Sequence, residues 1–326
     1  MIIGQKAVAT VKDSFGRNIG YLRISLTRRC NLNCLYCSPE TEAEYYEMTA
    51  DEIELCSKIF AELGVKKIRL TGGEPTMRHD LAEIVRRIKS LKKIKEIAMT
   101  TNALNLSLPL ARQLKAAGLD RINIGIDSLD SQTYKAITGA DRLDDALKGI
   151  DAALEAGFQP LRINVVLVKG INDKEVESFI SLARDNPLDV RFIELMPFSQ
   201  GKACPSGLSN ADILSKHPQL KPLAKNENDE ASGPCLYYAS SEFLGRVGFI
   251  SPISHKFCSD CNRVRLLSDA VLKPCLGHES EVDLKPYLKD YDSLKTAIER
   301  AVFDKPAAHA FESGPCSSRG MRTIGG

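Results

Sequence analysis

The chain has 326 residues, of which 43% are hydrophobic and 26% charged, an ordinary globular composition that can form a large core. Its formal net charge of +2 provides no electrostatic basis for wholesale binding to nucleic acid, so any anion must be bound locally. No apolar run is long enough to span a membrane, and the N-terminus lacks the apolar run of a signal peptide. We therefore expect a cytoplasmic protein without membrane or nucleic-acid partners.

The first two thirds of the chain alternate between short β-branched or aliphatic runs and amphipathic stretches. Strands are expected, in chain order, at residues 21–27, 67–71, 96–101, 121–127, 161–168 and 190–196. Helices are expected between them, near residues 50–63, 80–91, 107–117, 141–156 and 172–184. Six strand–helix repeats predict a parallel α/β sheet, either open and doubly wound or curved into an incomplete barrel.

The chain changes character after Pro197. Residues 198–240 are rich in Ser, Pro, Asn and Gly, which predicts a surface connection with one short helix near 210–216. Residues 241–285 should form short strands around a second group of cysteines. The last eleven residues have no periodicity, and by composition alone they would be a frayed tail.

The first group of cysteines directly follows the first expected strand. Cys30, Cys34 and Cys37 would share a loop at the carboxyl end of that strand, where ligands gather in parallel α/β folds. Three close thiolates suit an iron–sulfur cluster, and they leave one iron of a 4Fe–4S cluster open for an external ligand. Spacing alone also allows a zinc site that borrows a fourth ligand.

The second group consists of Cys258, Cys261 and Cys275, and it is followed by His278. Grouped thiols in a cytosolic protein bind metal or do chemistry more often than they form structural disulfides. A zinc ribbon with three Cys and one His fits this spacing. A second iron–sulfur cluster is the alternative.

The first cysteine segment resembles the radical S-adenosylmethionine superfamily. Its signature is CxxxCxxC with an aromatic residue before the last cysteine, here Tyr36, and the run TGGEP at 71–75 follows at the next strand end. In that superfamily the open iron binds the amino and carboxylate groups of S-adenosylmethionine, and the reduced cluster cleaves this cofactor to a 5′-deoxyadenosyl radical. The paired glycines would let the backbone approach the amino acid part of the cofactor.

Nearly the whole chain is similar to the GTP 3′,8-cyclase family. The similarity includes TTN, RINI, IDSLD, RFIELMP, FCSDCNRVRL, LKPCL and the closing GG. It implies a second 4Fe–4S cluster on Cys258, Cys261 and Cys275, whose open iron binds the purine of GTP, with His278 as a bystander. It also implies an incomplete (β/α)6 barrel of the triose-phosphate-isomerase type at residues 1–230, whose open side is closed by a C-terminal cluster domain at residues 231–326.

The resemblance implies roles for individual residues. Those expected to contact GTP are Arg23, Arg69, Thr100, Arg162, Arg263, Val264 and Arg265. Those expected to line the S-adenosylmethionine site are Tyr36, Gly73, Gly125 and Met196. The expected catalytic residues are Cys30, Cys34, Cys37, Gly325 and Gly326, the last two on a tail that also carries Arg319 and Arg322 and enters the barrel to complete the site.

Three positions depart from the pattern of the family. Gly125 stands where Ser is usual, so only a backbone contact remains there. Arg162 stands where Lys is usual, which keeps the charge and changes the geometry. Ala103 follows Asn102 where Gly is commoner, so the turn loses conformational freedom. These departures leave individual contacts open and do not affect the expected reaction.

Charged residues on the expected strands independently favour an anionic ligand. Alternation places Arg23, Arg69 and Arg162 on strands that should be aliphatic on both faces. Buried guanidinium groups are costly without anionic partners, and an internal layer of salt bridges is one way to supply them. Arg263 and Arg265 add to the excess, and Arg forks match phosphate oxygens. We therefore expect a triphosphate.

The resemblance implies a lyase that converts GTP to (8S)-3′,8-cyclo-7,8-dihydroguanosine 5′-triphosphate, the first step of molybdenum cofactor biosynthesis. The radical would abstract the 3′ hydrogen of the ribose, and the carbon radical would attack C8 of guanine. Expected partners are a flavodoxin or ferredoxin as electron donor, cyclic pyranopterin monophosphate synthase downstream, and a second copy in a homodimer. The alternatives are a peptide-modifying radical enzyme with an auxiliary cluster and a zinc-ribbon binding module on an inactive barrel.

Overall fold

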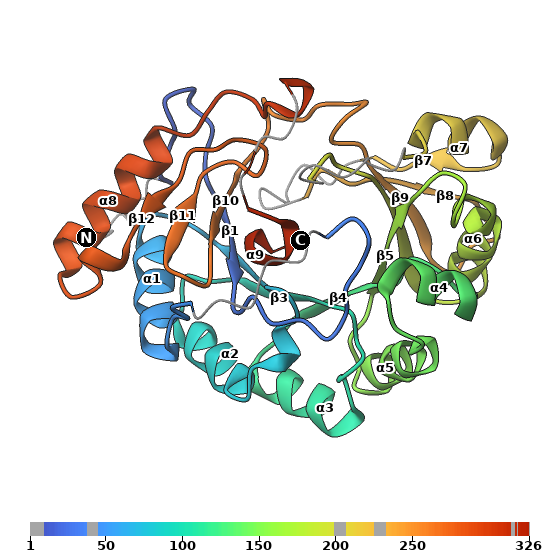
Figure 1. The fold of residues 1–326 in the computed structure, drawn as a ribbon, viewed down its shortest axis with the longest axis horizontal. Coiled ribbons are helices and arrows are strands. Elements are labelled where there is room, and N and C mark those ends of the chain that lie inside the picture. Colours follow the sequence, from blue (N-terminus) through green and yellow to red (C-terminus); the bar gives the residue numbers. More distant parts are fainter. Residues whose placement is uncertain are drawn as a thin grey trace, which may run out of the picture.

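The computed structural model describes residues 10–37, 45–198, 207–224, 233–313, 317 and 319–325. Within these residues the chain forms an α/β fold around one open sheet of twelve strands (Figure 1). The strand order is β12-β11-β10-β1-β2-β3-β4-β5-β6-β9-β8-β7, so the sheet has two edges and does not close on itself. Gly326, which was expected in the active site, lies outside the described residues.

The centre of the sheet consists of the six parallel strands expected from the sequence. They are β1 Tyr21–Ser25, β2 Lys67–Thr71, β3 Glu96–Thr101, β4 Arg121–Gly125, β5 Leu161–Leu167 and β6 Leu188–Glu194. The expected helices between them are α1 Ala50–Glu62, α2 Leu81–Ser90, α3 Leu108–Ala117, α5 Leu143–Glu155 and α6 Val176–Asp185. Figure 1 shows these helices around the outside of the curved sheet.

Local signals fix the helix ends. The Thr49 side chain accepts a hydrogen bond from the Glu52 backbone N–H, and the Glu52 carboxylate accepts one from the Thr49 backbone, which together form a capping box. Ser107 caps α3, and Gly118 ends it in the left-handed region at φ +105°. Asp80 stands at the N-cap of α2 without a side-chain cap bond.

The C-terminal third extends the same sheet at both sides. Strand β10 (Arg263–Leu266) pairs in parallel with β1, and β9 (Arg246–Ile250) pairs in parallel with β6. The flanking strands β11 (Val271–Lys273), β12 (Val282–Asp283), β8 (Leu236–Ala239) and β7 (Lys221–Pro222) are antiparallel. The sequence predicted short strands within residues 241–285, but it predicted a surface connection where β7 and β8 lie. It did not predict that these strands join the central sheet.

Four further α-helices lie among the described residues. The expected helix near 210–216 is α7, Asn210–Lys216. Two longer helices were not predicted, namely α4 (Ser131–Thr138) and α8 (Tyr291–Phe303). The short α9 (Met321–Ile324) lies inside the curve of the sheet, where the chain end is drawn in Figure 1. No helix among the described residues has both the length and the apolar character needed to cross a bilayer.

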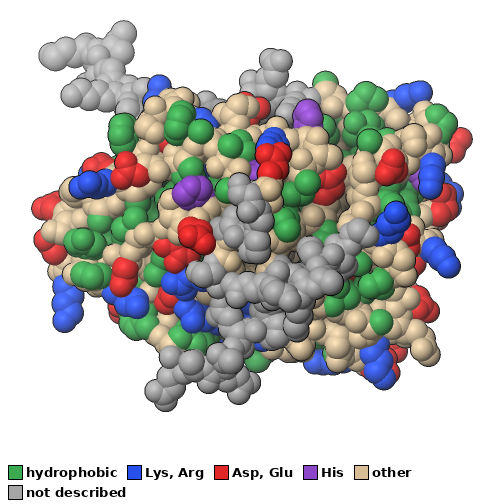
Figure 2. Space-filling view, turned by 45° about the horizontal axis from the view of Figure 1, so that its top comes forward, with side chains coloured by type: hydrophobic (Ala, Val, Ile, Leu, Met, Phe, Trp, Pro, Cys, Tyr) green, Lys and Arg blue, Asp and Glu red, His purple; other side chains and the backbone are tan. Residues whose placement is uncertain are grey.

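The main core lies between the sheet and the surrounding helices. Alternate residues of β1 face opposite ways: Leu22 and Ile24 are fully buried in this core, whereas Tyr21 and Arg23 line a cavity on the inner side. On the face drawn in Figure 2, basic and acidic side chains are interspersed. The position of the site is therefore set by the inner face of the sheet.

Candidate active site

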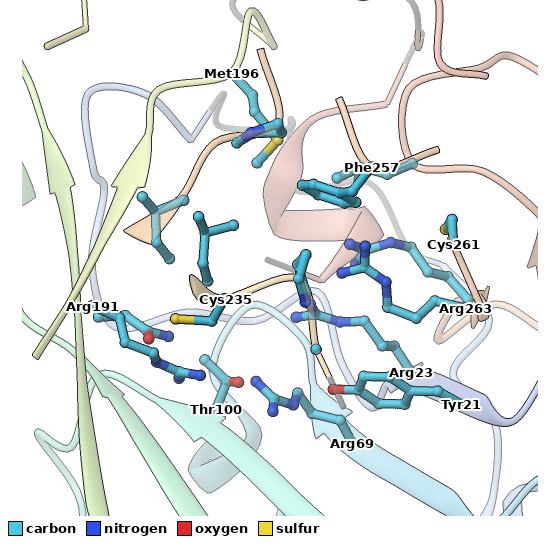
Figure 3. A pocket seen from close by; sticks show the side chains of 18 of the residues that line it. Tyr21, Arg23, Arg69, Thr100, Arg191, Met196, Cys235, Phe257, Cys261 and Arg263 are labelled. Carbon is cyan, nitrogen blue, oxygen red and sulfur yellow. The ribbon is translucent and has the colours of Figure 1, made fainter. Parts of the chain in front are cut away.

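A cavity of about 480 Å³ lies on the inner side of the sheet (Figure 3). Its lining includes side chains from β1, β2, β3, β5, β6 and β10, together with all three cysteines of the second group. None of the described lining residues is Asp or Glu. The cationic lining residues are Arg23, Lys67, Arg69, Arg121, Arg162, Arg191, Arg246, Arg263, Arg265 and Lys305. Such a cavity is suited to a small ligand with several negative charges.

Three of these arginines form a row across adjacent strands. Arg23 of β1 stands opposite Arg265 of β10 on one side and Arg69 of β2 on the other. Burial and the neighbouring arginines lower the pKa of Arg23 to about 9, while Tyr21 opposes the shift. Burial lowers the pKa of Arg69 to about 9 and that of Arg265 to about 10. Buried like charges at adjacent positions are unfavourable unless opposite charge offsets them.

Several buried polar atoms of the cavity lack a hydrogen-bond partner among the described residues. Among them are Arg69 Nε, Thr100 Oγ1, Asn164 Oδ1, and Arg191 Nε and Nη2. In Figure 3, Thr100 lies between Arg69 and Arg191. Buried polar groups are rarely left unsatisfied, so these atoms point to a bound ligand. Arg191 was missed from the sequence, although alternation along RFIEL, as on the other strands, would have placed it on the inner face.

Other cations of the cavity are already neutralised by salt bridges. Asp189 accepts hydrogen bonds from Arg246 at 2.6 and 2.8 Å and lies 3.5 Å from Arg162 Nε. Glu96 pairs with Lys67 at 2.9 Å and with Arg121 at 2.5 Å. The salt-bridge layer that the sequence left open therefore exists at one side of the cavity. Arg69 and Arg191 have no such partner among the described residues.

The loop of the first cysteine group packs directly on Gly72 and Gly73. A Cβ on Gly73 would lie 2.4 Å from the carbonyl oxygen of Arg29, and one on Gly72 would lie 2.7 Å from that of Thr27. The Gly73 N–H donates to the Thr27 carbonyl at 2.7 Å. The glycines thus admit the backbone of the cysteine loop, which is a different reason from the cofactor contact expected from the sequence.

Glu74 joins this loop to the end of β3. Its fully buried carboxylate accepts hydrogen bonds from Thr76, Thr101 Oγ1 at 2.7 Å and Asn102 N at 2.7 Å. The Asn102 side chain in turn donates to Asn31 Oδ1 at 2.7 Å and lies 4.0 Å from Cys30 Sγ. These contacts fix the position of the cysteine loop.

The backbone of the turn after Asn102 is strained at Ala103. Ala103 has a φ of +65°, in the left-handed region that side chains other than Gly rarely adopt. The sequence indicated this loss of freedom, and tight packing of Gly149 against the Ala103 carbonyl keeps the turn in place.

Tyr36, in the loop of the first cysteine group, is hydrogen-bonded to Asp127. Its hydroxyl donates to Asp127 Oδ2 at 2.5 Å, and Asp127 Oδ1 accepts from the Val166 backbone at 2.7 Å. Burial raises the pKa of Asp127 to about 6, although both hydrogen bonds oppose this shift. Gly125 ends β4 nearby, and a Cβ there would meet nothing within 4 Å, so the missing Ser leaves open space.

The chemistry of the first group fits an iron–sulfur cluster. Cys30, Cys34 and Cys37 are half-buried within one loop. Burial raises the pKa of Cys34 well above its ordinary value, and Asp127 and the other two thiols add to this effect. Three thiolates in this loop therefore need a compensating cation, which iron supplies.

The second cysteine group also fits a cluster, because nearby cations favour the thiolate form of Cys261. Although burial alone would raise it, the pKa of the Cys261 thiol falls to about 7 because of Arg263 and Lys305. Arg17 donates to the carbonyls of Cys258 at 2.7 Å and Pro306 at 2.6 Å, which fixes this loop. Across the described residues, no three His, Cys, Asp or Glu side chains are placed to hold a single metal ion.

His278 does not join the second cysteine group. Its Nδ1 is engaged with the Ser280 backbone at 3.1 Å and hydroxyl at 2.6 Å, and the residue does not line the cavity. This placement agrees with the bystander role expected from the sequence. Val264, expected to contact GTP, is fully buried in the main core, so its side chain faces away from the cavity.

The C-terminal tail reaches both cysteine-bearing regions. Arg322 donates to the Leu32 carbonyl at 2.6 Å, inside the first cysteine loop. The carbonyl of Gly325 accepts from Arg265 at 2.5 Å. Gly325 has a φ of +80°, and a Cβ there would lie 2.3 Å from Thr71 Oγ1, so the close approach requires glycine.

The tail is anchored outside the cavity as well. Arg319 pairs with Asp269 and with Glu281, each at 2.8 Å, and Asp269 also binds Arg28 at 2.6 Å. Met196 and Met321 line the cavity near this segment. The cavity brings together ten of the residues that the sequence singled out: Arg23, Arg69, Thr100, Arg162, Met196, Cys258, Cys261, Arg263, Arg265 and Cys275. The described residues Cys30, Cys34, Cys37, Tyr36, Gly73 and Gly125 do not line it.

Comparison with known proteins agrees with this arrangement. Residues 24–183 match the radical SAM superfamily, and residues 188–311 match the family Molybdenum Cofactor Synthesis C. The crystal structure of Streptococcus suis SuiB has a similar fold, with a TM-score of 0.64 at 16% identity, over 88% of this chain and 66% of that protein. These matches and the open α/β sheet define the chain as a radical SAM enzyme.

Curated relatives narrow this class. The GTP 3′,8-cyclase of Peptoclostridium acidaminophilum is 42% identical over 96% of this chain and 98% of that protein. The GTP 3′,8-cyclase of Clostridium botulinum strain Langeland is 43% identical over 96% of this chain and 99% of that protein. At this identity over nearly the full length, the chain belongs to the GTP 3′,8-cyclase family.

Proposed function

We propose that the chain converts GTP to (8S)-3′,8-cyclo-7,8-dihydroguanosine 5′-triphosphate with S-adenosylmethionine as cofactor, the first step of molybdenum cofactor biosynthesis. The observation that carries this proposal is a cavity whose lining joins the buried Arg69 and Arg191, which have no carboxylate partner among the described residues, to the second cysteine group. A triphosphate supplies the missing negative charge, and the opposite end of GTP would face Cys258, Cys261 and Cys275. The named relatives support the same substrate.

Each part of the site has a task in this proposal. Cys30, Cys34 and Cys37 would hold the first 4Fe–4S cluster, and the second cysteine group would hold another. Bound S-adenosylmethionine at the first cluster would supply the radical chemistry that removes the 3′ hydrogen of the ribose. Arg69 and Arg191 would bind the triphosphate, while the tail residue Gly325 closes the site above Thr71. The chain thus positions two ligands and excludes water.

The peptide-modifying alternative rests on shared fold alone. SuiB has been crystallised with its precursor peptide SuiA, but it is only 15% identical to this chain in that complex. A cavity with this excess of arginine favours a small polyanion over a peptide. The zinc-ribbon alternative would leave the buried nitrogen atoms of Arg69 and Arg191 without a ligand.

The domain division belongs to the same proposal. Residues 1–230 would form the incomplete barrel with the first cluster, and residues 231–326 would close its open side with the second. The pairing of β9 with β6 and of β10 with β1 supports this, because both edges of the six-stranded sheet are covered by the C-terminal third. We also propose a flavodoxin or ferredoxin as electron donor, cyclic pyranopterin monophosphate synthase as the recipient of the product, and a homodimeric state.

Anaerobic reconstitution tests the proposed function. The protein is loaded with iron and sulfide and incubated with dithionite, S-adenosylmethionine and each nucleoside triphosphate in turn. We expect about eight irons per chain for two clusters, with 5′-deoxyadenosine and a cyclised product formed from GTP alone. Four irons with zinc, and cofactor cleavage without a product from GTP, would contradict the proposed substrate.

Replacing the second cysteine group tests whether the two clusters have separate roles. We expect simultaneous replacement of Cys258, Cys261 and Cys275 by Ala to abolish cyclisation while some cleavage of S-adenosylmethionine persists, because the first group lies in a separate loop. Product and 5′-deoxyadenosine are measured in the same reaction by chromatography. Complete loss of cleavage in a folded variant would argue against separate roles.

A further inference from the structure

Lys305 is a buried cation that the proposed reaction does not use. It follows α8, its side chain lines the cavity, and the residue is 2% exposed. Its ammonium donates to the carbonyl of Pro274 at 2.7 Å. Within the described part of the chain, no carboxylate lies within salt-bridge distance of this ammonium. A buried ammonium group without a counter-charge is strongly unfavourable.

A second buried lysine, Lys273, is neutralised by a carboxylate of the chain itself. Lys273 of β11 is 0% exposed, and its ammonium binds Glu281 at 3.1 Å and the His278 carbonyl at 2.6 Å. The chain therefore supplies a carboxylate where a buried lysine has only a structural task. The absence of such a partner at Lys305 indicates that another anion belongs there.

The groups around Lys305 identify this anion. Lys305 lines the same cavity as Cys258, Cys261 and Cys275, and its acceptor Pro274 directly precedes Cys275. The segment is also fixed relative to the second cysteine loop, because Arg17 bridges the carbonyls of Cys258 and Pro306. A group held by these three cysteines would lie beside a cation of fixed position.

We propose that Lys305 is the resident counter-cation of the second cluster and raises its reduction potential. This inference rests on the proposed function, in which Cys258, Cys261 and Cys275 hold a 4Fe–4S cluster. Three thiolates make the cluster anionic, and one-electron reduction adds a further negative charge. A fixed positive charge stabilises the reduced form more than the oxidised form, since charge around a cluster sets its potential. Arg263 of β10 is a second cation of this cavity, but it is only half-buried, whereas Lys305 is 2% exposed.

Two substitutions separate charge from hydrogen bonding. Lys305→Gln removes the charge and keeps a donor for the Pro274 carbonyl, whereas Lys305→Arg keeps the charge. Lys295→Gln is the matched control, since Lys295 lies on α8 with its side chain 36% exposed and 3.9 Å from Glu62. All are made in the full chain in which Cys30, Cys34 and Cys37 are replaced by Ala, so that one cluster titrates.

The measurement is a potentiometric titration of the second cluster with dithionite, followed by electron paramagnetic resonance. We expect Lys305→Gln to shift the one-electron equilibrium about tenfold toward the oxidised form, which is about 59 mV. Lys305→Arg should stay within about threefold of the native value, and Lys295→Gln should not shift. A native potential in loaded Lys305→Gln would overturn the role of Lys305.

Iron and sulfide content resolves the remaining outcomes. Loss of the cluster from Lys305→Gln, with retention in Lys305→Arg, would support a requirement for the charge. Loss from both variants would show that the lysine only maintains the loop, and it would overturn the inference. A native background with no cluster on the second cysteine group would overturn the proposed function itself, which the iron content distinguishes from an unchanged potential.

Discussion

At the scale of single residues, the site is defined by charges that the chain itself does not balance. Asp189 and Glu96 neutralise one side of the cavity, but Arg69 and Arg191 keep buried atoms without partners among the described residues. Like charges on adjacent strands destabilise a sheet, so their presence indicates a functional constraint. Arg162 Nε also lacks a hydrogen bond, but it lies 3.5 Å from the Asp189 carboxylate, whereas Arg69 and Arg191 have no such carboxylate among the described residues.

Arg191→Ala should weaken binding of GTP by about 1.5–3 kcal/mol, the scale of hydrogen bonds to a charged group. The Arg191 guanidinium has two buried nitrogen atoms without a partner, so little structural stability depends on it. Isothermal titration of the anaerobic protein with GTP measures this change. Arg112→Ala is the control, because Arg112 forms an exposed pair with Glu155 at 2.9 Å. Native affinity in the Arg191 variant would remove this residue from the phosphate site.

Asp127 should make stability depend on pH in an unusual direction. Its pKa is about 6 in the folded chain and 3.8 ordinarily, so folding takes up a proton between these values. Its contribution is therefore fully present below about pH 3.8 and is lost as the pH rises through 6. The difference amounts to about 3 kcal/mol, since one pKa unit corresponds to about 1.4 kcal/mol.

Denaturant unfolding of the cluster-free chain checks this expectation. The native chain should gain stability relative to Asp127→Asn as the pH falls from 7 to 4. Comparison with the variant cancels the opposite contributions of carboxyls with lowered pKa, such as Asp80. A constant difference between the two proteins over this range would refute the assignment.

At the scale of elements, the tail couples the two cysteine-bearing regions. Arg319 shares Asp269 with Arg28, which precedes the first cysteine group, and Arg322 binds the Leu32 carbonyl inside that group. Gly325 then meets Arg265 of β10. One short segment therefore contacts the loop of the first cysteine group and a strand beside the second, so its order should depend on the Asp269 anchor.

Asp269→Asn should loosen the tail without unfolding the sheet. The variant loses the charge that two arginines share, which corresponds to about 1.5–3 kcal/mol. Hydrogen exchange of residues 319–325 should accelerate at least tenfold, followed by mass spectrometry. Glu312→Gln is a matched control, because Glu312 binds Lys256 in an exposed pair at 2.6 Å. Equal protection in both variants would show that Asp269 does not anchor the tail.

The sequence predicts the central strands within two residues because each is a short apolar run between turn residues. It also predicts the cysteine groups and most of the arginines. It misses α4, whose eight residues are too few for a clear period, and it misses the pairing of β10 with β1. Residues 21 and 263 are paired in register, and no local pattern marks so distant a partner. The partners of Arg162 and the isolation of Arg191 depend on such pairings.

At the scale of the whole molecule, positive charge is concentrated in the lining of the cavity. The chain as a whole carries only +2, and basic and acidic side chains are interspersed on its visible face. The excess is instead concentrated on the inner side of the sheet. A compact polyanion that fills the cavity should therefore stabilise the entire fold by mass action.

Inorganic tripolyphosphate should raise the thermal stability of the cluster-free chain. Saturation at one hundred times the dissociation constant corresponds to about 2.7 kcal/mol. Scanning calorimetry should show a rise in Tm that sulfate at equal ionic strength does not produce. The rise should shrink in Arg69→Gln, which removes a buried guanidinium from the row. Equal effects of both anions would indicate general screening instead of a site.

Strands β9 and β10 lie on opposite sides of the six central strands, and this placement has a consequence for synthesis of the chain. The ribosome releases β1 to β6 first, and during that time β1 and β6 each have one unpaired edge. Unpaired strand edges are templates for aggregation. The pairing of β1 with β10 joins residues more than two hundred positions apart, and such contacts form late. We therefore expect the nascent chain to depend on chaperones until the segment that carries the second cysteine group has emerged, so the last third protects the first before it takes part in any chemistry.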